Sequence, residues 1–238
     1  MRYAINPARQ LFVVIGAIML VAAIGARASA QRAEEHVSNE QGIGSVMKLP
    51  APKQTRGVSL EQAIERRRSV RDFSEVALTD AEHGQLLWAA QGLTHRTMGR
   101  RAAPSAGALY PLAAYLVTPA GVFHGEPRGH QLRRTVASDV REALFDAALR
   151  QEAVRDAPSV LVLAGVYERT AKKYGARAKR YVYMEAGHAA QNVLLQAVSL
   201  GLAAVPVAAF DDGEVQQALG LPKRHRPLYL LPVGHPAP

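Results

Sequence analysis

The chain has 238 residues, a hydrophobic fraction of 48% and a formal net charge of +9. Its length and composition predict one to one and a half globular domains. Because the sequence contains no cysteine, disulfides, thiol nucleophiles and thiolate metal sites are excluded.

The positive charge is unevenly placed. Arg2, Arg9 and Arg27 lie in the first thirty residues, where no acid occurs, so residues 31–238 hold 26 basic and 20 acidic residues, a net +6. An excess of this size suits an anionic cofactor or substrate. We expect no nucleic-acid partner, because only 6% of the residues are aromatic and stacking on bases requires aromatic side chains.

The first thirty residues have the organisation of an export signal. Arg2 and Arg9 precede or flank the start of an apolar segment over 11–25, and Ala28-Ser29-Ala30 gives the small-x-small pattern of a cleavage site. This predicts a signal peptide over residues 1–30, with an uncleaved membrane anchor as the alternative, because the apolar segment is slightly long. Under both interpretations the body is exported to the periplasm or cell envelope, and any membrane contact is through this segment.

Residues 31–57 are polar and rich in glycine and proline, which predicts a flexible arm before a folded domain over 58–238. Two helix starts follow. The pairs Ser59/Gln62 and Thr79/Glu82 have the spacing of capping boxes, each ahead of an apolar face.

Apolar periodicity predicts the remaining elements. They are a hairpin with strands at 113–117 and 122–123, a helix over 138–151, a strand over 159–166, a helix over 211–219 and a last strand over 228–233. Helices and strands mix without regular βαβ alternation, so we expect an α+β domain with a mixed sheet.

The segment 181–210 contains no charged residue after Glu185. Its first part has helical spacing and ends at Gly201, which predicts a long helix buried on nearly every side. A short strand, broken by Pro206, is expected after it. A membrane span is the alternative, but polar side chains interrupt the run at His188, Gln191, Asn192 and Gln196.

A basic cluster at the end of the first helix carries the first candidate site. Arg67, Arg68, Ser69 and Arg71 bring guanidinium groups and a hydroxyl together, as a phosphate monoester requires. The alternative is a solvated basic helix end.

Four segments, in this order, resemble the nitroreductase superfamily of flavoproteins. They are RRSVRDF from residue 67, LLWAAQGLT from residue 86, PSAGALYP from residue 104 and GHAAQNVLLQAVSLGL from residue 187. PSAGALYP and KKYGARAKRYVYMEAGHAAQN, from residue 172, most resemble the SagB/ThcOx-type dehydrogenase branch. The resemblance extends from about Ser59 to the carboxyl end.

The resemblance implies an α+β sandwich with a mixed central sheet flanked by helices, and an intertwined homodimer with a long central helix. It also implies FMN in clefts at the subunit interface. The residues implied to hold the FMN phosphate are Arg67, Ser69 and Arg71, with Arg68 beside them, and those implied to lie along the ring or ribityl chain are Pro104, Ser105 and Gly107. The resemblance also implies FMN-binding roles for Gln191 and Asn192 on the dimer helix and for Val205 and Pro206 on the strand beside the ring.

Members of this branch that oxidise azolines use a Lys-Tyr pair as acid and base beside the flavin, and Lys173-Tyr174 stands at the corresponding place. The alternative is that the surrounding basic stretch, 172–180, is a solvated helix face. Because azoline formation needs ATP, an exported protein is not expected to share that pathway.

These observations predict an exported, FMN-dependent oxidoreductase that transfers hydride between the flavin and a small organic or peptide-derived substrate. The electron donor and acceptor are left open. The alternatives are an NAD(P)H-dependent nitro or quinone reductase and a non-catalytic flavin-binding protein. A serine hydrolase is not expected because G-x-S-x-G is missing around Ser105, and a metal site is not expected because the eight histidines are scattered.

Overall fold

The computed structural model describes residues 42–54 and 58–238. Their compact unit is Ile43–Pro238. The predicted signal peptide or anchor over 1–30, and the parts of the predicted arm at 31–41 and 55–57, lie outside the described residues.

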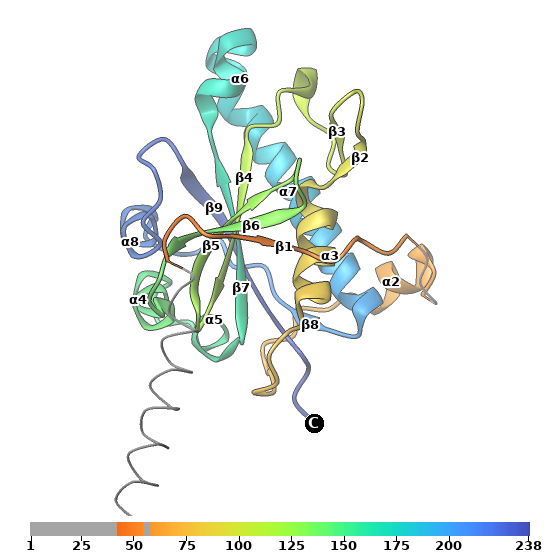
Figure 1. Cartoon of the computed structure of the whole chain (residues 1–238), viewed down its shortest axis with the longest axis vertical. Coiled ribbons are helices and arrows are strands. Elements are labelled where there is room, and N and C mark those ends of the chain that lie inside the picture. Colours follow the sequence, from red (N-terminus) through yellow and green to blue (C-terminus); the bar gives the residue numbers. More distant parts are fainter. Residues whose placement is uncertain (1–41, 55–57) are drawn as a thin grey trace, which may run out of the picture. The chain divides into compact units, whose positions relative to one another are not determined.

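The core is a seven-stranded sheet (Figure 1). Its strands, in spatial order, are β1 (Val46–Lys48), β6 (Gln131–Val136), β5 (Gly121–Glu126), β4 (Leu112–Thr118), β7 (Ser159–Gly165), β9 (Arg226–Gly234) and β8 (Ala203–Ala204). Every pairing between these strands is antiparallel. The α+β class is therefore confirmed, but the sheet is antiparallel rather than mixed. The reason is that none of the helical connections brings its two strands side by side in the same direction, as a parallel pair requires.

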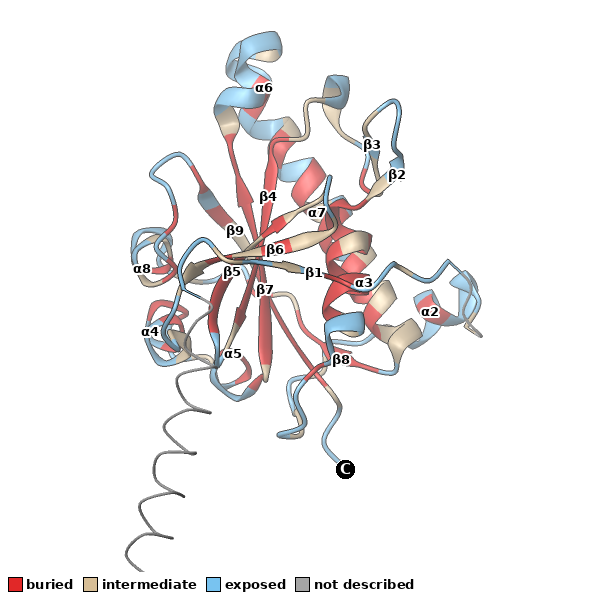
Figure 2. Ribbon diagram, viewed as in Figure 1, coloured by how far each residue is buried: buried red, intermediate tan, exposed pale blue. Residues whose placement is uncertain are grey.

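Helices cover both faces of this sheet (Figure 1). On one face lie α3 (Asp80–Gln91) and α7 (Ala178–Leu200), and on the other lie α4 (Arg141–Ala147), α5 (Glu152–Asp156) and α8 (Asp212–Ala218). Alternate residues of the central strands pack into the two layers, so β4 and β7 are buried almost throughout (Figure 2).

Both predicted capping boxes are present. Ser59 accepts a hydrogen bond from Gln62 N at the start of α2 (Leu60–Arg66), and Thr79 accepts one from Glu82 N at the start of α3. In each case the third residue also bonds back to the cap, so two otherwise unpaired backbone donors are satisfied.

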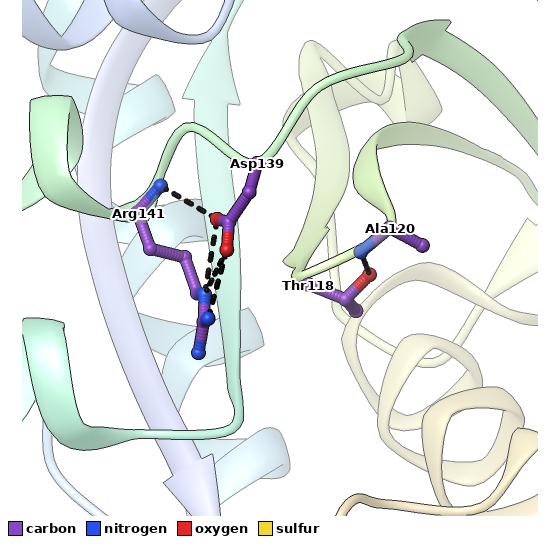
Figure 3. Close-up of polar contacts among 4 residues, drawn as sticks. All are labelled: Thr118, Ala120, Asp139 and Arg141. Carbon is purple, nitrogen blue, oxygen red and sulfur yellow. Dashed lines mark hydrogen bonds and ion pairs between the residues drawn. The ribbon is translucent and has the colours of Figure 1, made fainter.

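The predicted helix over 138–151 is instead two short helices, α4 and α5. Leu149 and Arg150 separate them with positive φ angles of 56° and 57°, which no right-handed helix accommodates. The start of α4 is held by Asp139, which accepts hydrogen bonds from the backbone and the guanidinium of Arg141 (Figure 3). The same view shows the β4–β5 turn, where Thr118 Oγ1 accepts from Ala120 N at 3.2 Å.

The compact unit begins earlier than the predicted boundary at residue 58. Strand β1 pairs with β6, and Leu49 is buried in the core. Gln85 then fixes the following residues, because its side chain accepts from Lys53 N at 2.8 Å and donates to Lys53 O at 3.0 Å. The described end of the expected arm is therefore part of the fold.

Helix α7 has the predicted length and ends at Gly201, whose φ is 73°. It is buried on one face and not on nearly every side: Tyr183, Met184, His188 and Gln191 are exposed. Among the residues described, no helix is both long and apolar enough to span a membrane.

Candidate functional site

The basic segment after α2 lies beside strand β8. Val70 N donates to Ala204 O at 3.1 Å, which places Ser69 and Arg71 next to Val205 and Pro206. These four residues line one cavity of about 570 Å³, as the resemblance implied. Its remaining wall is formed mainly by the start of α5, with carboxylates from Glu152 and Asp156 and contacts from Asp72, Gln151 and Ala153. The structure thus brings together two of the predicted phosphate ligands and the two strand residues.

The other two arginines of the cluster lie differently. Arg67 is the C-terminal cap of α2, and its N–H donates to Ala63 O. Arg68 Nη1 donates to the carbonyl oxygens of Glu65 and Arg67, at 2.7 and 2.8 Å. Because these bonds hold the helix end, Arg68 does not face the large cavity and lines a smaller one of about 250 Å³.

The segment Pro104–Tyr110 forms a tight loop around η1 (Ala106–Ala108). Ser105 Oγ closes the loop by accepting a hydrogen bond from Tyr110 N at 2.9 Å. Gly107, Ala108 and Tyr110 all have positive φ angles, of 63°, 54° and 47°. Only glycine adopts this conformation without steric cost, so the loop is held under strain by its surroundings.

Helix α6 (Tyr167–Tyr174) places the predicted acid–base pair against this loop. A Cβ atom added to Gly107 would lie 3.0 Å from Tyr174 Oη and 3.3 Å from Lys173 Nζ. The Lys173 ammonium also lies 5.5 Å from the centre of the Tyr174 ring. The fold therefore brings Gly107, Lys173 and Tyr174 into one site, with Ser105 two residues away in the loop.

A residue that sequence reasoning missed lies beneath the loop. The carboxyl of Glu185, on α7, is 2% exposed, and its Oε1 has no hydrogen-bond partner among the described residues. Burial raises its pKa to about 7, although Ser105, Arg101 and Gln91 act in the opposite direction. A signal was available, because Glu185 lies at helical spacing with the buried positions Val182 and Ala189.

Glu185 also lines a cavity of about 270 Å³ on the outer side of the loop. The other lining residues are Pro104, Ser105, Ala106, Tyr181, Met184 and His188. The predicted ring-binding residues Pro104 and Ser105 therefore share a cavity with a buried carboxyl.

The predicted pair on α7 divides between two environments. Asn192 Nδ2 donates to Ala89 O at 3.2 Å and so connects α7 to α3, whereas Gln191 is exposed. Asn192 also lines a cavity of about 690 Å³ bordered by α2, α3 and α7.

The predicted cofactor residues thus form two main groups within one chain. Ser69, Arg71, Val205 and Pro206 line the cavity beside β8, whereas Pro104 and Ser105 line the cavity beside Glu185. The two cavities have no lining residue in common.

Comparisons with known proteins show which family the sequence matches. The profile of the Nitroreductase family matches residues 64–235. A Methanocaldococcus jannaschii protein named as a nitroreductase is 41% identical over 198 residues, which are 81% of this chain and 98% of that protein.

Solved structures share the fold. A crystal structure from Ralstonia eutropha, also titled as a nitroreductase, has a TM-score of 0.75 at 28% identity and covers 81% of this chain and 90% of its own. The Escherichia coli microcin synthetase McbBCD complex contains a chain with a TM-score of 0.63 at 23% identity, over 82% of this chain and 79% of that one. At that identity the second likeness concerns the fold alone.

Proposed function

Because the chain belongs to the nitroreductase family, a family of oxidoreductases, we propose that it is an FMN-dependent oxidoreductase acting on a small organic or peptide-derived substrate. The observation that carries the proposal is the contact of Gly107 with Lys173 and Tyr174. This contact puts a proton-transferring pair against a strained loop of the kind that approaches a flat ligand closely.

The residues present fit FMN. Arg71 and Ser69 supply a guanidinium and a hydroxyl for a phosphate at the cavity beside β8, whose lining also includes the carboxylates of Asp72, Glu152 and Asp156. Gly107 lacks a Cβ where one would crowd Lys173 and Tyr174, so backbone and catalytic side chains can both approach a planar ring. Arg67 and Arg68 do not line this cavity, and Arg68 is already bonded to backbone carbonyls, so Arg71 is the guanidinium that we assign to the phosphate.

We further propose that the working form is a homodimer with the flavin site between subunits. Two features support this. The cofactor residues occupy separate cavities in one chain, and a dimer would bring Arg71 of one subunit together with Ser105 of the other. The exposed residues of α7 from Tyr183 onward, among them Met184, His188 and Gln191, also carry no charge, as a helix packed against another copy requires.

When bound, FMN would supply the hydride acceptor or donor. The chain's own residues would handle protons and position the substrate. Tyr174 Oη and Lys173 Nζ lie on the same side of the loop, so one can remove or return a substrate proton while the other stabilises the charge that results. This is the arrangement expected of the SagB/ThcOx-type branch, and we assign the chain to that branch as part of the proposal.

The proposal also covers where the protein works and how its flavin is reoxidised. We propose export to the periplasm or cell envelope on the strength of residues 1–30, and reoxidation by oxygen or a quinone, because nicotinamide cofactors are scarce outside the cytoplasmic membrane. An NAD(P)H-dependent nitro or quinone reductase is the second candidate.

The visible absorption spectrum of the purified protein tests the proposal directly. A flavin spectrum, with FMN identified chromatographically after release, is the expected result. A colourless protein that also fails to bind added FMN would contradict it. Stopped-flow mixing with NADH then separates the candidates, because rapid bleaching favours the NAD(P)H-dependent reductase. Bound FMN with no turnover by any donor, and no effect of replacing Lys173 or Tyr174, identifies a non-catalytic flavin-binding protein.

A further inference from the structure

Positive charge is concentrated around the loop Pro104–Tyr110. Segments 93–102 and 167–181 together hold nine basic residues and one acid, a net +8, whereas residues 31–238 as a whole are +6. The part of residues 31–238 that lies outside these two segments therefore has a net charge of −2. We call the nine basic residues the basic rim: Arg96, Arg100, Arg101, Arg169, Lys172, Lys173, Arg177, Lys179 and Arg180.

The two segments of the basic rim meet at Tyr110. Arg101 N donates to Tyr110 Oη at 3.2 Å, and the Arg101 guanidinium lies 4.8 Å from the centre of the Tyr110 ring. From the other segment, Arg169 Nη1 donates to Tyr110 O at 3.1 Å. Figure 1 shows α6 and the β2–β3 hairpin, with β2 at Leu93–His95 and β3 at Arg100–Arg101, at the same end of the sheet. The rim thus borders the site of Gly107, Lys173 and Tyr174.

The rim lacks the carboxylates that usually balance such a surface. Within the described part of the chain, none of its side chains forms an ion pair, and all except Arg101 are exposed. The charges also affect one another: burial first, and then the Arg169 charge, lower the pKa of Arg101, while the nearby Glu185 carboxylate raises it. Uncompensated like charges beside a cavity raise the local concentration of ligands of opposite sign.

Two of these cations are directed at the reaction site. Arg169 and Lys173 are four residues apart and therefore lie on the same face of α6. Arg169 contacts the loop at Tyr110, and Lys173 contacts it at Gly107. The adjacent cavity of about 270 Å³, lined by Ser105, is large enough for one or two aromatic rings.

We propose that the basic rim binds the anionic group of the substrate, so that the substrate is a small molecule carrying a carboxylate or sulfonate. This inference deepens the proposed function and rests on it. The anionic group lies among the cations of α6 while the reacting part of the substrate lies beside the loop Pro104–Tyr110, next to the Lys173–Tyr174 pair.

The test compares two electron acceptors of similar shape: 1,4-naphthoquinone-2-sulfonate, which is an anion, and 2-methyl-1,4-naphthoquinone, which is neutral. The enzyme flavin is reduced anaerobically with dithionite, and its reoxidation, in which two electrons and two protons pass to the quinone, is followed by absorbance. The rim variant is Lys172→Glu/Arg177→Glu. The control is Lys48→Glu/Lys223→Glu, which changes the net charge equally at exposed positions outside the rim.

We expect the rim variant to react about tenfold more slowly with the sulfonate at low ionic strength, because two charges are reversed near the anion, a net change of four units, and the difference to shrink as salt is added. Reaction with the neutral quinone stays within about twofold, and the control variant behaves as the wild type. Equal slowing with both quinones, or no slowing, overturns the proposal.

If the protein holds no flavin, the proposed function fails, and equilibrium dialysis of the same quinones against the flavin-free chain still tests the rim. The proposal is supported if the rim variant binds the sulfonate more weakly but binds the neutral quinone normally, and the control variant binds both normally. Sulfonate binding that is the same in the rim variant and the control variant overturns it. Rim-dependent binding to vesicles containing anionic lipid, with no discrimination between the quinones, also overturns it and assigns the surface to a membrane.

Discussion

Replacing Glu185 by glutamine should change how the stability of the flavin-free chain depends on pH. Burial raises the pKa of Glu185 from an ordinary 4.5 to about 7. Between these values the folded chain keeps a proton that the unfolded chain releases, so the free energy of unfolding falls as pH rises through this window and is lowest above pH 7. Each pH unit of the window corresponds to about 1.4 kcal/mol, which gives a loss of at most about 3 kcal/mol.

Glu185→Gln has nearly the shape of the protonated side chain and stays neutral. We therefore expect the variant and the wild type to differ little at pH 5, and the variant to be more stable at pH 8 by about 1 to 3 kcal/mol. Urea unfolding at the two pH values measures this. Titration of other groups cancels in the comparison, and Glu142→Gln, at an exposed carboxyl on α4, controls for loss of one acid. The reasoning is refuted if the stability difference between Glu185→Gln and wild type is the same at pH 5 and pH 8.

Three further predictions test the site. Gly107→Ala and Gly99→Ala each place a side chain at positive φ and should each lower the free energy of unfolding in urea by about 1 kcal/mol. Only Gly107→Ala should also abolish turnover, because Gly99 has open space around it. Equal activities of the two variants would show that the Gly107 contact is not needed. Tyr174→Phe should lower turnover about 100-fold or more while FMN content is unchanged, and unaltered turnover would remove Tyr174 from catalysis. Arg71→Ala should weaken FMN binding at least about tenfold, and more than Arg68→Ala, whose guanidinium is already bonded to backbone carbonyls; fluorescence titration with FMN measures both, and the reverse order would reassign the phosphate.

The elements that the sequence predicted well are those specified by neighbouring residues. The capping boxes at Ser59 and Thr79 fix the starts of α2 and α3 through bonds that span three residues. Gly201 ends α7 because its left-handed conformation is accessible mainly to glycine. Such rules need no knowledge of the rest of the chain.

The elements that were missed depend on distant partners. Strand β1 is three residues long and exists because Met47 pairs with Leu132, far along the chain. Nothing local distinguishes this segment from a polar arm. Likewise, the break between α4 and α5 at Leu149 and Arg150 places two non-glycine residues at positive φ, which local preference disfavours and tertiary packing imposes.

The candidate site divides in the same way. Its motifs, around Arg71 and Ser105, could be found by resemblance, because the residues of each motif are contiguous. The contact of Lys173 and Tyr174 with Gly107 joins a helix to a loop more than sixty residues earlier, and the burial of Glu185 depends on that loop lying over α7. Helical spacing could have indicated the burial of Glu185, but the contacts that join the loop to α6 and α7 are between segments far apart in the chain, so they had to come from the structure.

Packing within one chain explains only part of the lack of charge on α7 after Glu185. Residues such as Ala186, Ala189 and Val193 face the sheet and need to be apolar. His188 and Gln191 face outward, where a solvated helix commonly carries lysine or glutamate, yet no charged residue occurs there. Burying a charge without a partner is costly, so a strip that must enter an interface excludes charges, whereas a strip in water has no reason to. Sedimentation of the wild type and of Gln191→Glu separates these cases: a dimer that dissociates in the variant agrees with the interface, and a monomer in both contradicts it.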